Sequence, residues 1–518
     1  MDVYVVGAGL AGSECALQLA QYGFSVHLYE MKLANIFSPA HKIPDFAELI
    51  CSNSLGSTSE FSPAGELKIE AQMMNSYILK AAQLSQVPAG QALGVDRILL
   101  SQKITNWITQ HPNITIHKEL VEDIEDLPRP LVIATGPLTH DKLAYSIQNH
   151  FKNIYHHDFL YFFDAIAPII SADSIDTSIA WRADRYDKGD ADYLNCPMSK
   201  EQYFKFITAI KNARKIEPKD FEITPFFEGC MPIEAMLARG DQTLRFGPMK
   251  PVGLTDPRTG KPPYAIVQLR QENKEGTAYN IVGFQTRMAY GDQKEVFKMI
   301  PGLENAEFLK LGSMHRNLFI NTPLLLNKDL SSKNDDELYF AGQITGVEGY
   351  FESTTMGLLV AHFIQFKFGH KTKNKKLALN NIDLNNFLFE TNLKYPPRES
   401  AIGSLLNSIT DEHKINHFQP TNINMGSFPI LEEEKIKPIL SDTLENSSIS
   451  DNNLKTEDKS LNSSHKKYKN RNRTRELDKA EKKKQQIRNA NKAFTNWLVH
   501  KNGSTSNLDL YGEQFKEL

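Results

Sequence analysis

The chain has 518 residues, of which 41% are hydrophobic and 23% charged, a mixture typical of a soluble globular protein with two or three packed domains. No stretch reaches the roughly 18 uninterrupted apolar residues of a membrane-spanning helix, and the amino terminus lacks the pattern of a signal peptide, so we expect a cytoplasmic protein. The formal net charge is −3, but residues 466–492 carry twelve Lys or Arg against three acids, so a polyanion would be drawn to that segment.

The opening of the chain predicts a strand, a tight turn, a helix and a second strand. Residues 3–6 supply a β-branched run, and residues 26–29 form the second strand, which ends at Glu30. The Gly-x-Gly-x-x-Gly pattern between them lets the backbone approach a pyrophosphate and directs a helix amino terminus at the phosphates. An acid in the place of Glu30 accepts hydrogen bonds from ribose hydroxyls. The turn residues of this predicted dinucleotide site are Gly7, Ala8, Gly9, Leu10, Ala11 and Gly12.

Two later segments, 131–137 and 337–350, are predicted to be further strands of the same sheet. Each is apolar and each ends in glycine, where the ligand-facing crevice of a parallel sheet lies. The fold class is therefore a doubly wound, Rossmann-like α/β domain that is discontinuous in sequence. Both segments resemble the second and third cofactor contacts of glutathione-reductase-type flavoproteins, which favours FAD over NAD. The residues predicted to contact the cofactor there are Gly136, Gly342, Gln343, Gly346, Gly349 and Tyr350.

The middle of the chain has strands of its own, YAIVQLRQ and YNIVGFQTR, which indicate an α+β domain inserted into the first domain. Farther on, a segment rich in Asn, Ser, Asp and Lys predicts a disordered linker. It is followed by a basic helix that we expect to dock through Phe494, Trp497 and Leu498. The predicted parts are the FAD-binding domain at 1–200 and 321–432, the insertion domain at 201–320, the linker at 433–465 and the basic helical tail at 466–518.

The four cysteines lack the short paired spacing of a zinc site, so we predict free thiols and no metal centre. Cys15 lies on the expected packed side of the first helix, which favours a core residue. Cys196 precedes Pro197 in an expected loop, and nothing there indicates activation. Cys51 lies in a polar segment after the dinucleotide unit, and Cys230 lies in the phrase FEGCMPIE.

Several long phrases are distinctive, among them CSNSL, VPAGQALGVDR, FEGCMPIE, FGPMKPVGLTDPRTGKPPYAIVQLRQEN and AGQITGVEGYFES. Together they resemble the folate-dependent, FAD-containing tRNA (uracil-C5)-methyltransferases, the TrmFO family, over about residues 1–430. The chain departs from the family pattern at Leu318, where threonine is usual, and at Gly56, where a basic residue is frequent. Its carboxyl end is also longer.

The resemblance implies C5 methylation of the T-loop uridine of tRNA. Methylenetetrahydrofolate would give the carbon, and FAD reduced by NADH or NADPH would carry and reduce it. Uracil C5 becomes nucleophilic only after something adds to C6, for which a thiolate is well suited, and a base must then remove the C5 proton. By resemblance, Cys230 adds to C6 and Cys51 removes the proton or protects the flavin-bound carbon. An exchange of these two roles stays open.

Other side chains are candidates for the folate or substrate site. Tyr350 can lie against an isoalloxazine or pterin ring, or can pack as a core aromatic. His315 and Arg316 could bind the carboxylates or ring of the folate, and Arg287 a phosphate or glutamate tail; each also suits a surface salt bridge. Two further candidates, which could be acids beside the flavin or helix caps, are Glu348 and Glu352.

Two alternatives remain open at the level of sequence. A GidA-like flavoprotein that modifies the wobble uridine shares the flavin fold and folate chemistry, but usually works with a GTPase partner. The phrases around both cysteines favour the TrmFO family over this alternative. We therefore predict no obligate protein partner. The other alternative is a flavoprotein that only binds tRNA through its basic tail. That tail could neutralise RNA phosphates or be only a solvated face.

Overall fold

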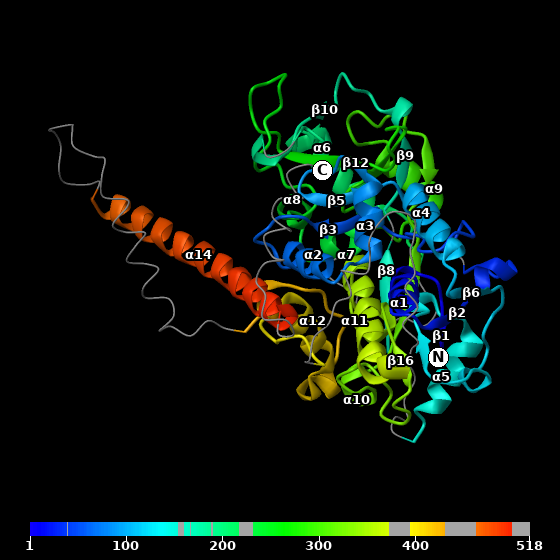
Figure 1. Ribbon diagram of the computed structural model, residues 1–518. Coiled ribbons are helices and arrows are strands. Elements are labelled where there is room, and N and C mark those ends of the chain that lie inside the picture. The colour runs from blue at the N-terminus through cyan, green and yellow to red at the C-terminus, as the bar shows by residue number, and fades with distance from the viewer. Residues whose placement is uncertain are drawn as a thin grey trace. The chain divides into compact units, whose positions relative to one another are not determined.

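The computed structural model describes residues 1–38, 40–153, 160–165, 167–187, 190–216, 231–371, 394–429 and 463–499 (Figure 1). The chain forms two compact units, which are described in turn. The first comprises Met1–Thr58, Ala71–Leu388 and Ile409–Asn422, and the second Ser59–Glu70, Phe389–Ser408 and Ile423–Leu518. Cys230 and residues 433–462 of the predicted linker lie outside the described residues.

A five-stranded parallel sheet organises the amino-terminal part of the first unit. Its strand order is β16-β7-β1-β2-β6, so the order reverses at β1, with β2 on one side and β7 on the other. Such a reversal opens a crevice at the carboxyl ends of the strands. The prediction that 131–137 and 337–350 join the opening strands is confirmed. The strands are β1 (Asp2–Val6), β2 (Ser25–Tyr29), β6 (Ile114–His117), β7 (Leu131–Ile133) and β16 (Leu338–Phe340).

Two helices pack against each other beside this sheet, α1 (Leu10–Gln21) and α11 (Tyr350–Phe368). Almost all of their residues are buried. They approach so closely that a Cβ atom at Gly357 would lie 2.1 Å from the backbone oxygen of Ala11. The contact fixes the amino terminus of α1 relative to the chain that follows β16.

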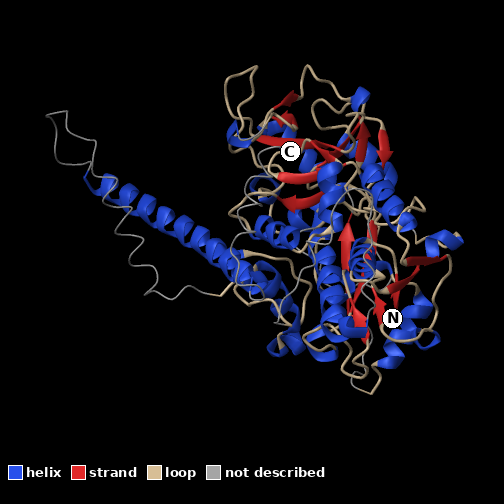
Figure 2. Cartoon of the chain, in the orientation of Figure 1, coloured by secondary structure: helices blue, strands red, loops and turns tan. Residues whose placement is uncertain are grey.

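A six-stranded antiparallel sheet forms the other large layer of the first unit, with strand order β10-β11-β12-β13-β9-β14. Figure 2 draws all strands of the chain in red. It shares an apolar core with residues of α6, α7, α8 and α9. Its strands come from both sides of residue 201, the predicted start of the insertion domain; the domain boundaries themselves stay a prediction. The strands are β9 (Ile169–Ser171), β10 (Trp181–Arg182), β11 (Leu194–Met198), β12 (Ala265–Gln271), β13 (Ala278–Ile281) and β14 (Phe308–Lys310). The helices are α6 (Lys200–Asn212), α7 (Ile233–Ala238), α8 (Thr243–Phe246) and α9 (Tyr290–Phe297).

The prediction of a loop around Cys196 is wrong, because Cys196 lies inside β11, opposite Val267 of β12. The neighbouring Pro197 suggested a break in the sheet. However, β10 pairs with β11 only at positions 194 and 195, so Pro197 faces no partner on that side and needs no N–H donor there.

Smaller elements complete the first unit. Strands β8 (Leu160–Ala165) and β15 (Met314–Phe319) form an antiparallel pair, and β3 (Ser54–Ser57), β5 (Ala92–Val95) and β4 (Gln86–Val87) form a three-stranded sheet. The remaining α-helices described in this unit are α3 (Tyr77–Leu84), α4 (Arg97–Gln110), α5 (Asp141–His150) and α10 (Thr322–Leu325).

The second unit contains most of α2 (Pro63–Met73) and α12 (Ala401–Thr410), together with α14 (Ser463–Val499), the long helix drawn in orange and red in Figure 1. Buried Glu70 of α2 accepts hydrogen bonds from the backbone N–H groups of Ala401 and Ile402, both at 2.7 Å, and so caps α12. The predicted docking of the basic helix is confirmed for Phe494 and Trp497, which are buried, while Leu498 is half-buried.

Candidate functional site

The glycine turn after β1 has the geometry predicted for a pyrophosphate site. A Cβ atom at Gly12 would lie 1.8 Å from the backbone oxygen of Gly7, so only glycine permits α1 to start this close to the strand. A Cβ atom at Gly9 would meet nothing within 4 Å. Packing therefore does not require Gly9, but the open space beside it lets a ligand reach the backbone. The N–H groups of the first turn of α1 face that space without intrahelical partners, as at any helix start.

Glu30 is held in place at the end of β2. Its carboxylate accepts hydrogen bonds from the backbone N–H groups of Ala8 at 2.8 Å and Lys32 at 3.0 Å. Both Glu30 and Gly9 line a pocket that is also lined by Thr135, after β7. The pocket thus offers a fixed carboxylate beside an open glycine turn, an arrangement that fits a ribose and a pyrophosphate.

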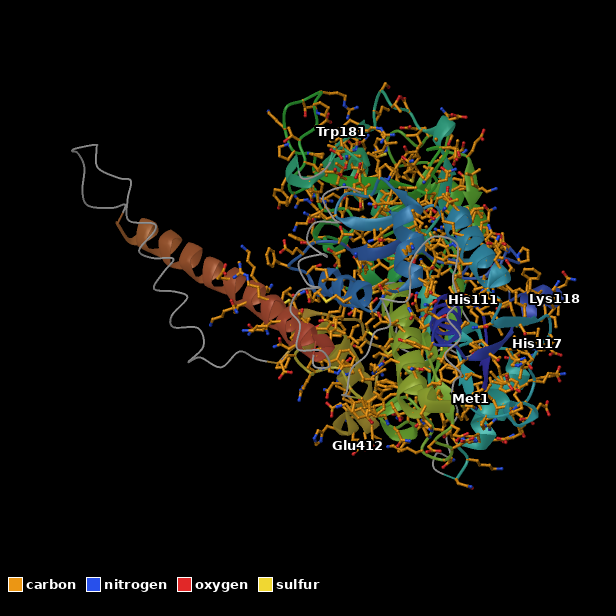
Figure 3. The ribbon with its side chains drawn as sticks, viewed as in Figure 1. Met1, His111, His117, Lys118, Trp181 and Glu412 are labelled. Atoms are coloured by element: carbon orange, nitrogen blue, oxygen red, sulfur yellow. The ribbon has the colours of Figure 1, made fainter. Side chains whose placement is uncertain are left out.

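An aromatic stack borders this pocket. The rings of Tyr29, which lines the pocket, and His117 are stacked with centroids 4.3 Å apart, and His117 is labelled in Figure 3. Burial and the neighbouring His27 lower the pKa of His117, so its ring favours the neutral form that stacks on a phenol. The stack keeps Tyr29 against the wall of the pocket.

The other predicted cofactor residues follow β7 and β16. Gly136 begins a short turn after β7, and Gln343 and Gly346 belong to the turn that follows β16. Gly342 has a φ of 84°, and a Cβ atom there would lie 2.7 Å from that of Ala11 in α1, which joins the third segment to the glycine turn. Gly349, with a φ of 115°, is the residue before α11.

Two polar residues of the third segment form a hydrogen bond with each other. The side-chain amide of Gln343 donates a hydrogen bond of 2.7 Å to the carboxylate of Glu348, which is 6% exposed. Glu352 lies in the first turn of α11, and its carboxylate extends back over Gly349, where a Cβ atom would be 2.2 Å from it. The structure thus places both predicted acids at the start of α11.

Cys51 lies at the same place. Its backbone N–H donates a hydrogen bond of 2.7 Å to the hydroxyl of Tyr350, the first residue of α11. The Cys51 backbone oxygen accepts from Arg97 at 3.2 Å, and Lys310 donates to the oxygen of Ile50 at 3.1 Å. The predicted thiol and the predicted aromatic residue are therefore neighbours, with two cations on the loop that carries the thiol.

Sequence reasoning missed these cations and the groups that orient them. Arg97 forms a bidentate ion pair with Glu272, at 2.7 and 3.1 Å, and Arg270 donates to the Ser52 hydroxyl at 2.9 Å. The sequence held a signal only for Arg270, which lies inside the mostly apolar strand YAIVQLRQ, since a buried charge requires a partner. Nothing in the sequence names that partner.

The other thiols differ in their surroundings. Cys15 and Cys196 are fully buried; burial raises the pKa of the Cys15 thiol far above its usual range and that of Cys196 to about 12. Cys15 is thus a core residue, as predicted. Cys230 lies outside the described residues. Arg287 adjoins both ends of the segment that contains it, because the Arg287 oxygen accepts from the Ile216 N–H at 2.8 Å and its own N–H donates to Glu234 at 3.3 Å.

His315 and Arg316 are described only by their backbone, in β15, where they pair with residues 164 and 163 of β8. Strand β15 lies beside the turns that contain Gly136 and Gln343. Within the described ranges, no group of three His, Cys, Asp or Glu side chains could hold a metal ion, and no helix has both the length and the apolar character needed to cross a membrane.

Comparison with known proteins gives consistent results. The family described as glucose inhibited division protein A (GidA) matches residues 2–372. Methylenetetrahydrofolate–tRNA-(uracil-5-)-methyltransferase TrmFO of Bdellovibrio bacteriovorus is 64% identical over 433 residues, 84% of this chain and 93% of the relative. The protein of the same name from Citrifermentans bemidjiense is 50% identical over 431 residues, 83% of this chain and 93% of the relative.

Solved structures agree on the fold. Aquifex aeolicus GidA superposes with a TM-score of 0.54 in one crystal form, covering 88% of this chain and 79% of that one, at 14% identity. In the other crystal form the TM-score is 0.56, covering 79% of this chain and 69% of that one, at 15% identity. At this identity the likeness concerns the fold alone.

Proposed function

Because the chain belongs to the TrmFO methyltransferases of the GidA family, we propose that it methylates C5 of the T-loop uridine of tRNA, with methylenetetrahydrofolate as carbon donor. The observation that carries this proposal is the hydrogen bond between Cys51 and Tyr350. This bond joins the loop of Cys51 to the last glycine segment of the dinucleotide fold, and so supports a role for the Cys51 thiol beside the flavin. A tRNA substrate puts the proposed reaction in the cytoplasm.

The residues of the crevice fit FAD. Glu30 would accept from the ribose, the backbone at Gly9 and the start of α1 would hold the pyrophosphate, and the segment from Gly342 to Tyr350 would lie along the flavin end. When bound, FAD supplies the two-electron reduction of the transferred carbon, with NADH or NADPH as the source of electrons. The chain itself has to orient the uridine, keep water out and move one proton.

The thiols account for the uracil chemistry. A thiolate adds to C6, which makes C5 nucleophilic, and C5 then bonds to the donated carbon. A base removes the C5 proton, and the electrons of that C–H bond form the C5–C6 double bond as sulfur leaves C6. We assign the addition to Cys230 and the proton to Cys51. His315, Arg316 and Arg287 are the proposed folate-binding residues.

The RNA would also contact the basic tail. Helix α14 exposes Lys482, Lys483, Arg488 and Lys492 and buries its opposite side. Such cations neutralise phosphates without reading bases. The GidA-like alternative shares the fold, but the 64% identity with a TrmFO favours C5 methylation over modification of the wobble uridine.

The test is transfer of labelled methylene from methylenetetrahydrofolate to unmodified tRNA by the purified yellow protein, with NADPH and with NADH. We expect 5-methyluridine, and we expect Cys51→Ala and Cys230→Ala each to abolish its formation. Cys196→Ala is the matched control, because that thiol is buried in the core of the six-stranded sheet. A flavin-containing protein that transfers nothing with either nucleotide would refute the methyltransferase function.

A further inference from the structure

The loop that carries Cys51 is held by cations at three successive carbonyl groups. Arg97 donates to the oxygen of Leu49 at 3.1 Å and to that of Cys51 at 3.2 Å, and Lys310 donates to the intervening oxygen of Ile50 at 3.1 Å. Arg97 belongs to α4 and Lys310 to β14, so two separate elements supply these bonds. The oxygens of three adjacent carbonyl groups thus hold two positive charges against the loop.

A third cation supports the next residue. Arg270 of β12 is only 9% exposed, and its guanidinium donates to the Ser52 hydroxyl at 2.9 Å. Its Nε atom is buried and has no hydrogen-bond partner among the described residues. A buried guanidinium with an unused donor is costly unless an anion compensates it.

The acids near these cations do not balance them. Glu272, 6% exposed, is the carboxylate that pairs with Arg97. Glu48 also acts on Lys310, but it forms its own ion pair with Lys32 at 3.4 Å. Among the residues that the structure describes, Arg97, Arg270 and Lys310 outnumber by two the one carboxylate that forms an ion pair with any of them, Glu272.

The cations also act on one another. Burial lowers the pKa of Lys310, and the charge of Arg97 lowers it further, while negative charge at Cys51, Glu48 and Glu272 raises it. Burial likewise lowers the pKa of Arg270, against the opposing effect of Tyr193 and Glu272. Mutual repulsion in a buried cluster is relieved by negative charge, and the side chains that Arg97 and Lys310 both sense are those of Glu272 and Cys51.

We propose that Arg97, Arg270 and Lys310 form an anion-holding cradle, a cluster of positive charge at the loop that carries Cys51, with Lys310 as the positioning residue that tunes the potential there. Reactive cysteines lie in such electropositive, partly exposed surroundings. The cradle deepens the proposed function and rests on it for its purpose, because addition of a thiolate to C6 places negative charge on the uracil ring, and positive charge beside Cys51 stabilises that anion.

The test compares two alkylating reagents on Cys51 of the flavin-containing protein, anionic iodoacetate and neutral iodoacetamide, with the modified peptide identified by mass. The ratio of their rate constants reports the local charge and cancels simple accessibility. We expect this ratio to be about threefold or more above that of the same peptide in the urea-unfolded chain, from one to two charges at several ångströms. This comparison needs no variant.

Variants then identify the source of the charge. We expect Lys310→Met to lower the ratio about threefold, the effect of one charge in a well-screened place, and Lys310→Arg to preserve it. Lys298→Met, at an exposed lysine after α9, is the control and should leave it unchanged. A wild-type ratio no higher than that of the unfolded chain, or an unchanged ratio in Lys310→Met, would overturn the proposal. Alkylation needs neither tRNA nor folate, so a failed methyl transfer with a high ratio would count against the proposed function alone.

Discussion

The backbone N–H of Cys51 donates a 2.7 Å hydrogen bond to the hydroxyl of Tyr350, 299 positions farther along the chain. Tyr350 begins α11 and follows the glycine segment after β16, whereas Cys51 precedes β3. One bond therefore joins the loop that carries a thiol to the segment that would lie along the flavin. The backbone position of Cys51 therefore depends on α11 as well as on its own loop.

Replacing Tyr350 with phenylalanine removes this acceptor and keeps the ring. We expect the rate of methyl transfer to fall about five- to tenfold, because one hydrogen bond of about 1 kcal/mol no longer fixes Cys51. Flavin content should be unchanged, since the backbone at Gly349 and the ring remain. Turnover and the visible spectrum measure both effects. Tyr290→Phe, at an exposed tyrosine, is the matched control; an equal loss in that variant would refute a specific role for Tyr350.

The sheet and its glycines could be predicted because their signals are local. A glycine pattern after a β-branched run and an acid at the end of the next strand are visible within thirty residues. The later strands were identified by the same rule, an apolar run that ends in glycine. Their parallel order then follows, because helical connections join the strands of a doubly wound sheet.

The surroundings of Cys51 could not be predicted in the same way. Arg97, Arg270 and Lys310 come from one helix and two strands, and their meeting at one loop is a property of the tertiary fold. At Cys196 the prediction was wrong for a related reason. The neighbouring Pro197 suggested a loop, but at that position β11 is paired on one side only, so the missing N–H of proline leaves no hydrogen bond unmade. Local rules miss both cases because they do not include the neighbouring strand.

Glu30 provides a test of the cofactor site that does not depend on the thiols. Its carboxylate is already oriented by the Ala8 N–H, so it is ready to accept from a ribose. We expect Glu30→Ala to weaken FAD binding about ten- to a hundredfold, the loss of one or two hydrogen bonds to a charged group. Titration of the flavin-stripped protein with FAD, followed by flavin fluorescence, measures this. Glu201→Gln, at an exposed position of α6, should bind FAD like the wild type. Wild-type affinity in Glu30→Ala would remove Glu30 from the site.

The second unit should respond to pH through Glu66. This glutamate is 1% exposed, and burial raises its pKa from 4.5 to about 7, with a smaller contribution from Glu60, while a hydrogen bond with Asn491 of α14 opposes the shift. The folded state therefore binds a proton that the unfolded chain releases above pH 4.5. The contribution of Glu66 to stability is largest below that pH and falls, by up to about 3 kcal/mol, as the pH rises to 7.

The pH effect can be isolated by substitution. We expect the thermal midpoint of the second unit to rise on acidification from pH 8 to pH 6, and Glu66→Gln to remove most of that rise, because the amide cannot ionise. Glu70 remains as a second buried acid in both proteins, so the difference between them reports Glu66. Glu399→Gln, at an exposed position of the same unit, should retain the full pH dependence. A Glu66→Gln protein with the wild-type pH profile would contradict the assignment.

The exposed side of α14 should contribute to RNA affinity through charge alone. We expect the triple variant Lys482→Gln, Lys483→Gln and Lys492→Gln to weaken tRNA binding at low salt. The slope of log affinity against log salt should become shallower by about 0.7 to 0.9 for each lost phosphate contact. Filter binding between low and moderate salt measures both quantities. Folding should be preserved, because Phe494 and Trp497, which dock the helix, are untouched. Lys294→Gln and Lys298→Gln together provide a control with charge removed from α9. If this control reduces the slope as much as the α14 variant does, the tail is only one part of a diffuse positive field. If the α14 variant keeps the wild-type slope, its lysines do not contact the RNA.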